Sequence, residues 1–430
     1  MAFVPADHVR ARFSAAMSDM YRAEVPQYGT LIDLVDAGNA AVLARDPALA
    51  DTMRRTGEIE RLAGERHGAI RVGTPAELAL IRRAFAVMGM VAVGYYDLAP
   101  AGVPVHSTAF RPIGQAALGA NPFRVFTSLL RLELIEDERL RAEAQAILDA
   151  RRIVTPGASA LIDQAERDGG LDAAAATDFV AELVETFRWH ATATVTADTY
   201  AHLLDAHRLI ADVVSFRGPH INHLTPRALD IDAVQAAMPS AGIIPKETIE
   251  GPPRRRCPVL LRQTSFKALD EPILFPSAAG EAVPGRHTAR FGEVEQRGAA
   301  LTPRGRAIYD NALAAARLGE DRFGELPDDW NALRRGGLAY FRYSGAPVPR
   351  VDLEAAIAAG DVQSDPLIYE DFLPVSAAGI FQSNLGAGVR SAYGAQADRA
   401  AFETALGGPV LDEFALYAAA EARSLERVVV

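Results

Sequence analysis

The sequence predicts an α+β fold that contains two units with the strand and helix order β-α-β-β-β. The same succession of one strand, one helix and three further strands occurs in residues 61–135 and again in residues 216–300. Helical periodicity dominates the segments before and between these units. The composition indicates a folded chain, since 49% of the 430 residues are hydrophobic and 23% are charged. We expect a single body over residues 1–430.

Residues 1–60 form the expected helical lead-in, because apolar residues between Ala6 and Ala44 recur at intervals of three and four, as in two amphipathic helices. The first unit, residues 61–135, begins with the expected strand RHGAIRVGT. The helix PAELALIRRAFAVMG follows, and Thr74 is a suitable N-cap for it. The remaining strands of this unit are expected in MVAVGYYDL, VHSTAFRPI and FRVFTSLLRLELI.

A helical insert is expected over residues 136–215, with a break at Gly169-Gly170. In the second unit, residues 216–300, a strand is expected in HINHLT and a helix in RALDIDAVQAAM. Three strands follow in SAGIIPKETI, CPVLLRQTSF and RHTARFGEVEQRG. Residues 301–430 mix helical and strand patterns, and we expect this C-terminal segment to pack against both units.

Charge and cysteine content exclude several classes of partner and site. The formal net charge of -11 disfavours phosphate backbones and anionic lipid surfaces, so neither nucleic acid nor a membrane is an expected partner. Cys257 is the only cysteine, which excludes intramolecular disulfides and cysteine-rich metal sites and fits the cytoplasm. The most apolar run, Ala84 to Tyr96, is shorter than the roughly 18 residues that a membrane span needs. The oligomeric state is left open.

Any metal site in this chain must use histidine, aspartate and glutamate, the ligands that suit Fe, Mn, Zn or Ni. His67 and Arg71 lie four residues apart on one predicted strand, so their side chains project to the same face. His220 and His223 point to opposite faces if HINHLT is extended, and His223 lies deeper in that strand. We therefore expect at most one of these two at an interior site, and favour His223.

Glu293 and Glu295 share a face of their predicted strand, and two buried carboxylates are costly unless a cation or hydrogen bonds compensate them. A metal would relieve one of them. Taken singly, these residues also fit structural or surface roles. His106, on a strand of the first unit, is an alternative ligand. His287 is expected at the mouth of the site. Four other histidines are expected on the surface or in packing contacts: His8, His190, His202 and His207.

The arrangement of histidine on the first strand of each unit and glutamate on the closing strand resembles the vicinal oxygen chelate superfamily. The stretch GEVEQR also resembles the iron-binding strand of 4-hydroxyphenylpyruvate dioxygenase. A closer resemblance, from about His67 to Asn384, is carried by RHGAIRVGT, FRGPHINHLTPRALDID, LLRQTSFKAL, FGEVEQRGAALT and LPVSAAGIFQS. These stretches resemble the 2-oxoadipate dioxygenase/decarboxylase family.

This resemblance implies that the paired units form a curved sheet around Fe(II), bound by His67, His223 and Glu293. It also implies that Arg71 binds a substrate carboxylate. Glu295 stands where the hydroxyphenylpyruvate enzymes have an apolar residue, so the choice between the two glutamates rests on the resemblance alone. Two further residues are implied to line the substrate pocket: Val375 and Ser376.

The implied reaction is the conversion of 2-oxoadipate and O2 to 2-hydroxyglutarate and CO2, a step of lysine degradation. Two alternatives stay open. One is another vicinal oxygen chelate activity, such as a glyoxalase-type isomerase or a ring-cleaving dioxygenase, which metal identity and oxygen uptake would distinguish. The other is a non-catalytic protein that binds a small ligand, which iron analysis would distinguish. The sequence contains no GxxxxGK[ST] motif for a nucleotide cofactor.

Overall fold

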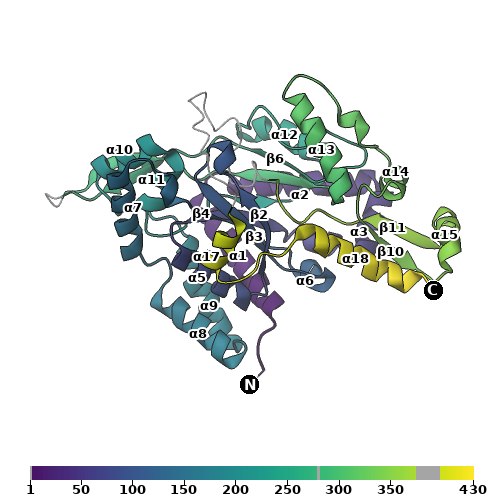
Figure 1. The fold of residues 1–430 in the computed structure, drawn as a ribbon, viewed down its shortest axis with the longest axis horizontal. Helices are drawn as coiled ribbons and strands as arrows, with labels where there is room; N and C mark the ends of the chain where they lie inside the picture. The colour runs from purple at the N-terminus through teal and green to yellow at the C-terminus, as the bar shows by residue number, and fades with distance from the viewer. Residues whose placement is uncertain (1, 278–280, 374–397) are drawn as a thin grey trace.

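The computed structural model describes residues 2–277, 281–373 and 398–430, and its centre is a mixed β-sheet with helices around it (Figure 1). The sheet has the strand order β2-β3-β4-β1-β5, in which β1 and β4 are parallel and the other pairs are antiparallel. The first unit contains β1 (Arg66–Val72), α5 (Pro75–Val87), β2 (Val91–Asp97), β3 (Val105–Arg111), α6 (Gln115–Ala120) and β4 (Arg124–Leu130). Thr74 caps α5 as predicted, with its side chain accepting a hydrogen bond from Glu77 N–H.

The two units join through strand β5 (Leu224–Pro226), which pairs antiparallel with β1. The second unit continues with α12 (Ile231–Ala237), β6 (Leu261–Ser265) and β9 (Glu293–Arg297). β6 pairs antiparallel with β9, and a parallel bridge between Arg227 and Glu295 connects β9 to the end of β5. The first strand, the helix and the closing strand of the second unit follow in the predicted order, whereas no strand forms in residues 240–249. The closing strand lies beside the first strand, as in the first unit.

Three strand predictions for the second unit were too long. HINHLT is a regular strand only from Leu224. Before it, Ile221 N–H donates to the carbonyl of Phe187, and Asn222 N–H donates to the carbonyl of Ala69 in β1. SAGIIPKETI forms only an isolated bridge, from Pro245 to Phe266 just after β6, and a proline cannot donate to a ladder. The next residue, Glu250, forms another isolated bridge, to Gln263 of β6.

RHTARFGEVEQRG is divided between β9 and a hairpin that the sequence did not reveal, β7 (Glu271–Phe275) with β8 (Val283–His287). The division falls at Gly292, where a Cβ would lie 1.8 Å from the Phe266 ring.

Helices cover the outer face of the central sheet. Ile70 and Val72 of β1 pack in one hydrophobic cluster with Phe13 and Phe187, whereas His67 and Arg71 alternate with them and face the opposite side. The lead-in consists of α1 (Ala6–Glu24), α2 (Tyr28–Arg45), α3 (Pro47–Thr56) and α4 (Ile59–Leu62). The insert consists of α7 (Glu138–Ala150), α8 (Pro156–Asp168), α9 (Ala173–Phe187), α10 (Ala197–Ala206) and α11 (Arg208–Ser215).

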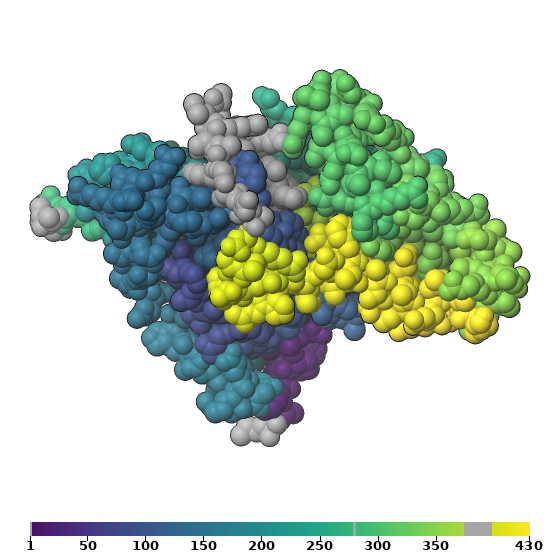
Figure 2. Space-filling model, viewed as in Figure 1, coloured from purple at the N-terminus to yellow at the C-terminus, as the bar shows by residue number. Residues whose placement is uncertain are grey.

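Most of the C-terminal segment lies at the end of the molecule opposite α10 and α11, whereas residues 399–406 lie beside α5 (Figures 1 and 2). Leu411 bridges Val93 of β2, and Ile368 bridges Ala299, which follows β9. Among the described residues no helix is both long and apolar enough to cross a membrane. This segment contains α13 (Pro303–Ala316), α14 (Trp330–Arg335), β10 (Phe341–Gly345), α15 (Leu353–Ala359), β11 (Val362–Pro366), α17 (Arg399–Leu406) and α18 (Glu413–Val428).

Candidate metal centre

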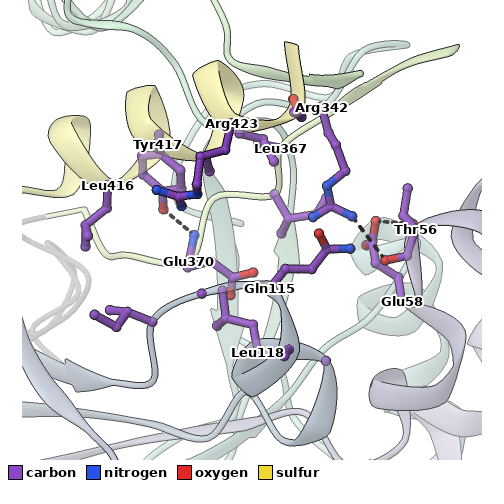
Figure 3. A pocket seen from close by; sticks show the side chains of 18 of the residues that line it. Thr56, Glu58, Gln115, Leu118, Arg342, Leu367, Glu370, Leu416, Tyr417 and Arg423 are labelled. Carbon is purple, nitrogen blue, oxygen red and sulfur yellow. Dashed lines mark hydrogen bonds between the residues drawn. The ribbon is translucent and has the colours of Figure 1, made fainter. Parts of the chain in front are cut away.

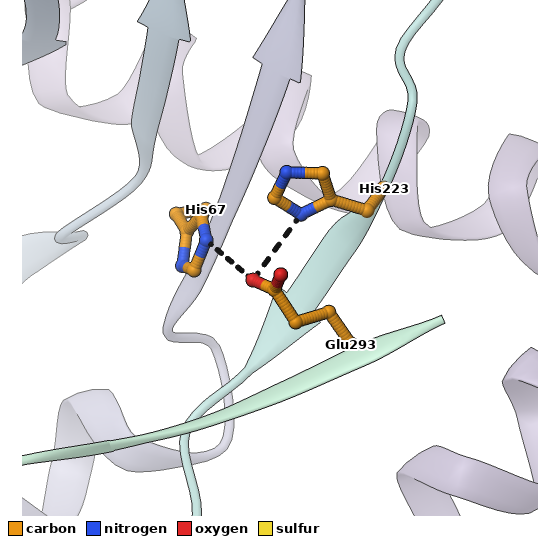
Figure 4. A group of neighbouring side chains, drawn as sticks. All are labelled: His67, His223 and Glu293. Carbon is orange, nitrogen blue, oxygen red and sulfur yellow. Dashed lines mark hydrogen bonds and ion pairs between the residues drawn. The ribbon is translucent and has the colours of Figure 1, made fainter. Parts of the chain in front are cut away.

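Three buried side chains from three strands or strand ends meet where the two units join (Figure 4). His67 comes from β1, His223 from the residue before β5, and Glu293 from the start of β9. One ligand atom from each lies within 4.8 Å of the other two. Glu293 Oε1 is 3.1 Å from His67 Nε2 and 3.5 Å from His223 Nδ1. The structure therefore brings together the three residues for which the resemblance implied metal binding.

The β1–β5 pairing creates this meeting point because it fixes His67 opposite Thr225 and Gly68 opposite Leu224. The chain before β5 passes very close to Gly68. A Cβ there would lie 2.3 Å from Ile221 Cδ1 and 3.0 Å from the carbonyl oxygen of His223. Glycine at this position thus allows the segment with His223 to approach β1.

Two side chains that the sequence analysis did not single out hold Glu293. Thr225 Oγ1 donates a hydrogen bond to Glu293 Oε1 over 2.9 Å, and Gln263 Nε2 donates to the same oxygen over 2.8 Å. The second carboxylate oxygen of Glu293 and Nε2 of His223 are buried without a hydrogen-bond partner in the part of the chain that the structure describes. Buried polar atoms of this kind are costly, and a bound cation would satisfy them.

The protonation states of His223 and Glu293 suit a metal ligand set, whereas His67 must release a proton to bind a metal. Burial lowers the pKa of His223 to about 4, so this imidazole is neutral at pH 7, the form that binds metals. Burial also acts to raise the pKa of Glu293, but the neighbouring His223 and His67 outweigh it and lower that pKa. For His67, burial acts to lower the pKa, and the attraction of Glu295 and Glu293 outweighs it and raises the pKa. Two imidazoles and one ionised carboxylate form a donor set that binds divalent transition metals.

Glu295 lies on the other side of His67 from Glu293. Its Oε2 is 3.0 Å from His67 Nδ1, and its Oε1 accepts a hydrogen bond from Arg297 Nε over 2.7 Å. Arg297 pairs with Glu295 at full burial and also donates to the carbonyls of Tyr369 and Asp371. Of the two glutamates, Glu293 is therefore the one that faces both histidines.

Arg71 lies on the same face of β1 as His67, and its side chain is 12% exposed. Its Nη1 donates to Oδ2 of Asp212 in α11 over 2.7 Å. Burial and then the charges of His67 and Arg71 act to lower the pKa of His223, against the charge of Glu293, which acts to raise it. Arg71 is therefore close enough to His223 to act on its charge. Its role toward a substrate stays a prediction. Two other residues predicted at this site lie outside the described residues: Val375 and Ser376.

The remaining histidines are not part of the group. His106 lies beside Tyr95 and Phe402, two strands away from β1, and burial lowers its pKa to about 4. His220 and His287 instead contact Asp212. The other four histidines lie on or next to helices of the lead-in and the insert: His8, His190, His202 and His207.

A separate groove of about 920 Å³ lies between α18 and α6 (Figure 3). Its lining includes Arg61, Arg342, Glu370, Tyr417 and Arg423, and none of the three residues of the metal group. Arg61 pairs with Glu370 inside this groove. The groove is therefore distinct from the candidate metal centre.

Comparison with known proteins places this chain in a family. Residues 13–384 match the family model described as 2-oxoadipate dioxygenase/decarboxylase. The chain belongs to this family. A curated 2-oxoadipate dioxygenase/decarboxylase from Pseudomonas putida is 58% identical, over 99% of this chain and 97% of the relative. Another from Escherichia coli is 56% identical, over 99% of this chain and 98% of the relative.

A solved structure of the family has the same fold as this chain. It is the crystal structure of the hydroxyglutarate synthase from Pseudomonas putida in complex with 2-oxoadipate, with a TM-score of 0.91 and 56% identity. The match covers 99% of this chain and 98% of that chain. The predictions of an α+β fold with paired units and of membership in the 2-oxoadipate dioxygenase/decarboxylase family are therefore confirmed.

Proposed function

We propose that this protein is a non-haem Fe(II) dioxygenase that converts 2-oxoadipate and O2 to 2-hydroxyglutarate and CO2. The buried group of His67, His223 and Glu293 carries the proposal, in a chain 58% identical to a relative with the corresponding name. The reaction balances without a second organic substrate. One carbon leaves as CO2, and the two oxygen atoms of O2 enter the new carboxylate and the new hydroxyl group.

His67, His223 and Glu293 would hold the iron. When bound to three protein ligands, iron supplies open coordination positions for a 2-oxo acid and for O2. Thr225 and Gln263 orient the Glu293 carboxylate through hydrogen bonds to Oε1. The Glu295 carboxylate lies 3.0 Å from His67 Nδ1, and its charge favours a proton on that nitrogen, which leaves Nε2 available as a ligand.

The surroundings of the two histidines are aromatic. Phe372 packs edge-on against His67 with 5.0 Å between ring centroids, and Phe291 stacks on His223 at 5.0 Å. Such walls exclude water, so that the oxidant is consumed by the substrate. Arg71 would bind a carboxylate of the substrate, because a guanidinium can grip a carboxylate at two points and stays charged.

We also propose that the reaction belongs to lysine degradation and takes place in the cytoplasm. The named substrate of the relatives, 2-oxoadipate, supports the first part, and the single cysteine is compatible with a reducing compartment.

The test is anaerobic reconstitution of the purified protein with Fe(II), followed by measurement of O2 consumption with a panel of 2-oxo acids. We expect 2-oxoadipate to give one CO2 and one 2-hydroxyglutarate per O2, and Zn(II)-loaded protein to give none. An isomerase would show turnover without O2 uptake. A ring-cleaving dioxygenase would consume O2 with catechols but not with 2-oxoadipate, and a binding protein would bind ligand without turnover. Any of these results would overturn the proposal.

A further inference from the structure

A buried cluster next to Arg71 is not used by the chemistry described above. Its centre is Asp212, whose side chain is 7% exposed and whose two oxygens each have partners. Oδ2 accepts a hydrogen bond from Arg71 Nη1 over 2.7 Å. Oδ1 lies 2.9 Å from His287 Nε2 and 3.2 Å from His220 Nε2. Asp212 is thus held by side chains on both sides.

The hydrogen bonds extend away from Asp212 in one direction. His287 Nδ1 lies 2.8 Å from Tyr200 Oη. When His287 carries its proton on Nε2, it donates to Asp212 through Nε2 and accepts a hydrogen bond from the tyrosine hydroxyl at Nδ1. Trp189 stacks on the His287 ring, with an interplanar angle of 8°. The ring of His287 therefore has little freedom to rotate, and the carboxylate that it contacts is fixed in turn.

The cluster assembles from parts of the chain that are distant in sequence. Arg71 belongs to the first unit, Tyr200 and Asp212 to the helical insert, and His287 to the β7–β8 hairpin. Since Asp212 and Tyr200 come from the last two helices of the insert, these helices place polar groups against the site as well as burying apolar surface.

The charge balance explains what such a cluster does. An arginine side chain has many rotamers, and a guanidinium that is mostly buried requires an anion nearby. Burial acts to raise the pKa of Asp212, but the attraction of His220 and Arg71 outweighs it and holds that pKa well below its ordinary value. The carboxylate is therefore ionised and keeps the guanidinium in one place. A charged hydrogen bond of this length also fixes the direction of the guanidinium plane.

We propose that Asp212 is a positioning residue that aims the Arg71 guanidinium at the substrate and thereby sets the preference for dicarboxylic over monocarboxylic 2-oxo acids. This inference rests on the proposed function of Arg71. The contact of Asp212 with Nη1 orients the fork of the guanidinium, and a two-point grip on a carboxylate depends on that orientation.

The experiment compares Asp212→Asn and Asp212→Glu with the wild type, all reconstituted with Fe(II). Rates are measured with 2-oxoadipate and with 2-oxohexanoate, the monocarboxylic acid of equal length. Asp212→Asn should lower kcat/KM for 2-oxoadipate at least tenfold, mainly through KM, and change that for 2-oxohexanoate less than threefold. Asp212→Glu keeps the charge and should recover part of the loss. Iron content should stay at the wild-type level.

Asp232→Asn is the matched control. Asp232 forms a comparable ion pair with Arg262, with 2.6 Å between Oδ2 and Nη1, and neither residue belongs to the metal group or to the Asp212 cluster. This variant should leave the ratio of the two kcat/KM values unchanged. Equal losses on both acids with a lowered melting temperature would reduce Asp212 to a structural role. Tighter binding of 2-oxoadipate in Asp212→Asn would show that Asp212 opposes the substrate charge rather than positioning Arg71. Either outcome overturns the inference.

Failure of the proposed function is separable from failure of this inference. If the wild type consumes no O2 with 2-oxoadipate, the proposed function fails. Anaerobic calorimetry of 2-oxoadipate and 2-oxohexanoate binding then decides the positioning role alone. A preference for the dicarboxylate that Asp212→Asn abolishes and Asp232→Asn retains would support it, and an equal preference in all three proteins would overturn it.

Discussion

His67 Nε2 lies 3.1 Å from Glu293 Oε1, although 226 positions separate these residues in the chain. His67 belongs to the first strand of the first unit, and Glu293 to the closing strand of the second. Neither unit alone contains the complete group. The candidate metal centre therefore forms only where the two units join, and the short strand β5 with its pairing to β1 determines its geometry.

Removal of any member of this group should abolish metal binding. His67→Ala, His223→Ala and Glu293→Ala each leave two of the three protein ligands, so we expect iron content to fall below about a tenth of the wild-type value and turnover to disappear. The fold should persist, because the group adds few of the contacts that hold the sheet. Metal analysis with circular dichroism checks this, and full activity in one variant would remove that residue from the ligand set.

The two neighbouring glutamates should differ in importance. Glu293→Gln removes the carboxylate that faces both histidines, whereas Glu295→Gln removes one that contacts His67 from the far side and pairs with Arg297. We expect Glu293→Gln to eliminate metal binding and Glu295→Gln to weaken it by about 10- to 100-fold, as for other carboxylates that orient a ligating histidine. Titration with Co(II), followed by its absorption, measures both. The reverse order would make Glu295 the ligand.

Arg71→Lys should separate substrate binding from metal binding. Lysine keeps the positive charge but loses the planar two-point grip, so kcat/KM for 2-oxoadipate should fall by about 1.5–3 kcal/mol in transition-state free energy. Iron content should stay near the wild-type value. Equal losses with a monocarboxylic 2-oxo acid would mean that Arg71 contacts the carboxylate common to both. No loss with either acid would leave Arg71 a purely structural partner of Asp212.

Local patterns in the sequence predicted the four strands and the first helix of the first unit, but not α6. The three residues of the candidate metal group were implied by the family resemblance. β1 shows apolar alternation, its helix has a Thr74 cap, and the resemblance supplied the roles of His67, His223 and Glu293. The second unit was harder to predict because its strands are short and irregular. Pro245 confines one segment to isolated bridges, and the β7–β8 hairpin interrupts the run before Glu293.

The supporting residues of the site could not be predicted from spacing. Thr225 lies two residues after His223, but nothing in the pattern shows that its hydroxyl reaches Glu293. Gln263 reaches the same carboxylate from β6, and Asp212 reaches Arg71 from a helix of the insert. These contacts depend on how separate elements pack, which periodicity does not encode. The sequence pattern of the insert predicted only a set of helices.

Gly68→Ala should damage the metal centre through the backbone. The added Cβ would meet Ile221 Cδ1 and the carbonyl oxygen of His223. The end of the isoleucine can rotate away, but the carbonyl can move only if the segment before β5 moves with it. We expect a loss of about 1–3 kcal/mol in the free energy of unfolding, the range for overpacked sites, together with weaker metal binding.

Gly119→Ala provides the control for that substitution, since a Cβ at this helical position has nothing within 4 Å. It should be neutral or slightly stabilising, because alanine has a higher helix propensity than glycine. Urea unfolding and Co(II) titration of both variants make the comparison. Unchanged metal affinity in Gly68→Ala would show that the approach of His223 to β1 tolerates a methyl group.

Glu413, the first residue of α18, should make the protein less stable as the pH rises through neutrality. Burial and then the neighbouring Asp371 raise the pKa of this carboxyl to about 7. Between the lower pKa of the unfolded chain and about pH 7, the folded state therefore binds more protons than the unfolded state, and stability declines as pH increases. Glu413→Gln has no proton to lose, so its free energy of unfolding should decline less between about pH 5 and pH 8. The difference from the wild type should be at most roughly 3 kcal/mol, since one pKa unit corresponds to about 1.4 kcal/mol.

Glu426→Gln, at an exposed position of the same helix, is the control and should show the same decline with pH as the wild type. Urea unfolding at both pH values tests this, and parallel declines in the wild type and Glu413→Gln would show that Glu413 is ionised at little cost in the folded protein.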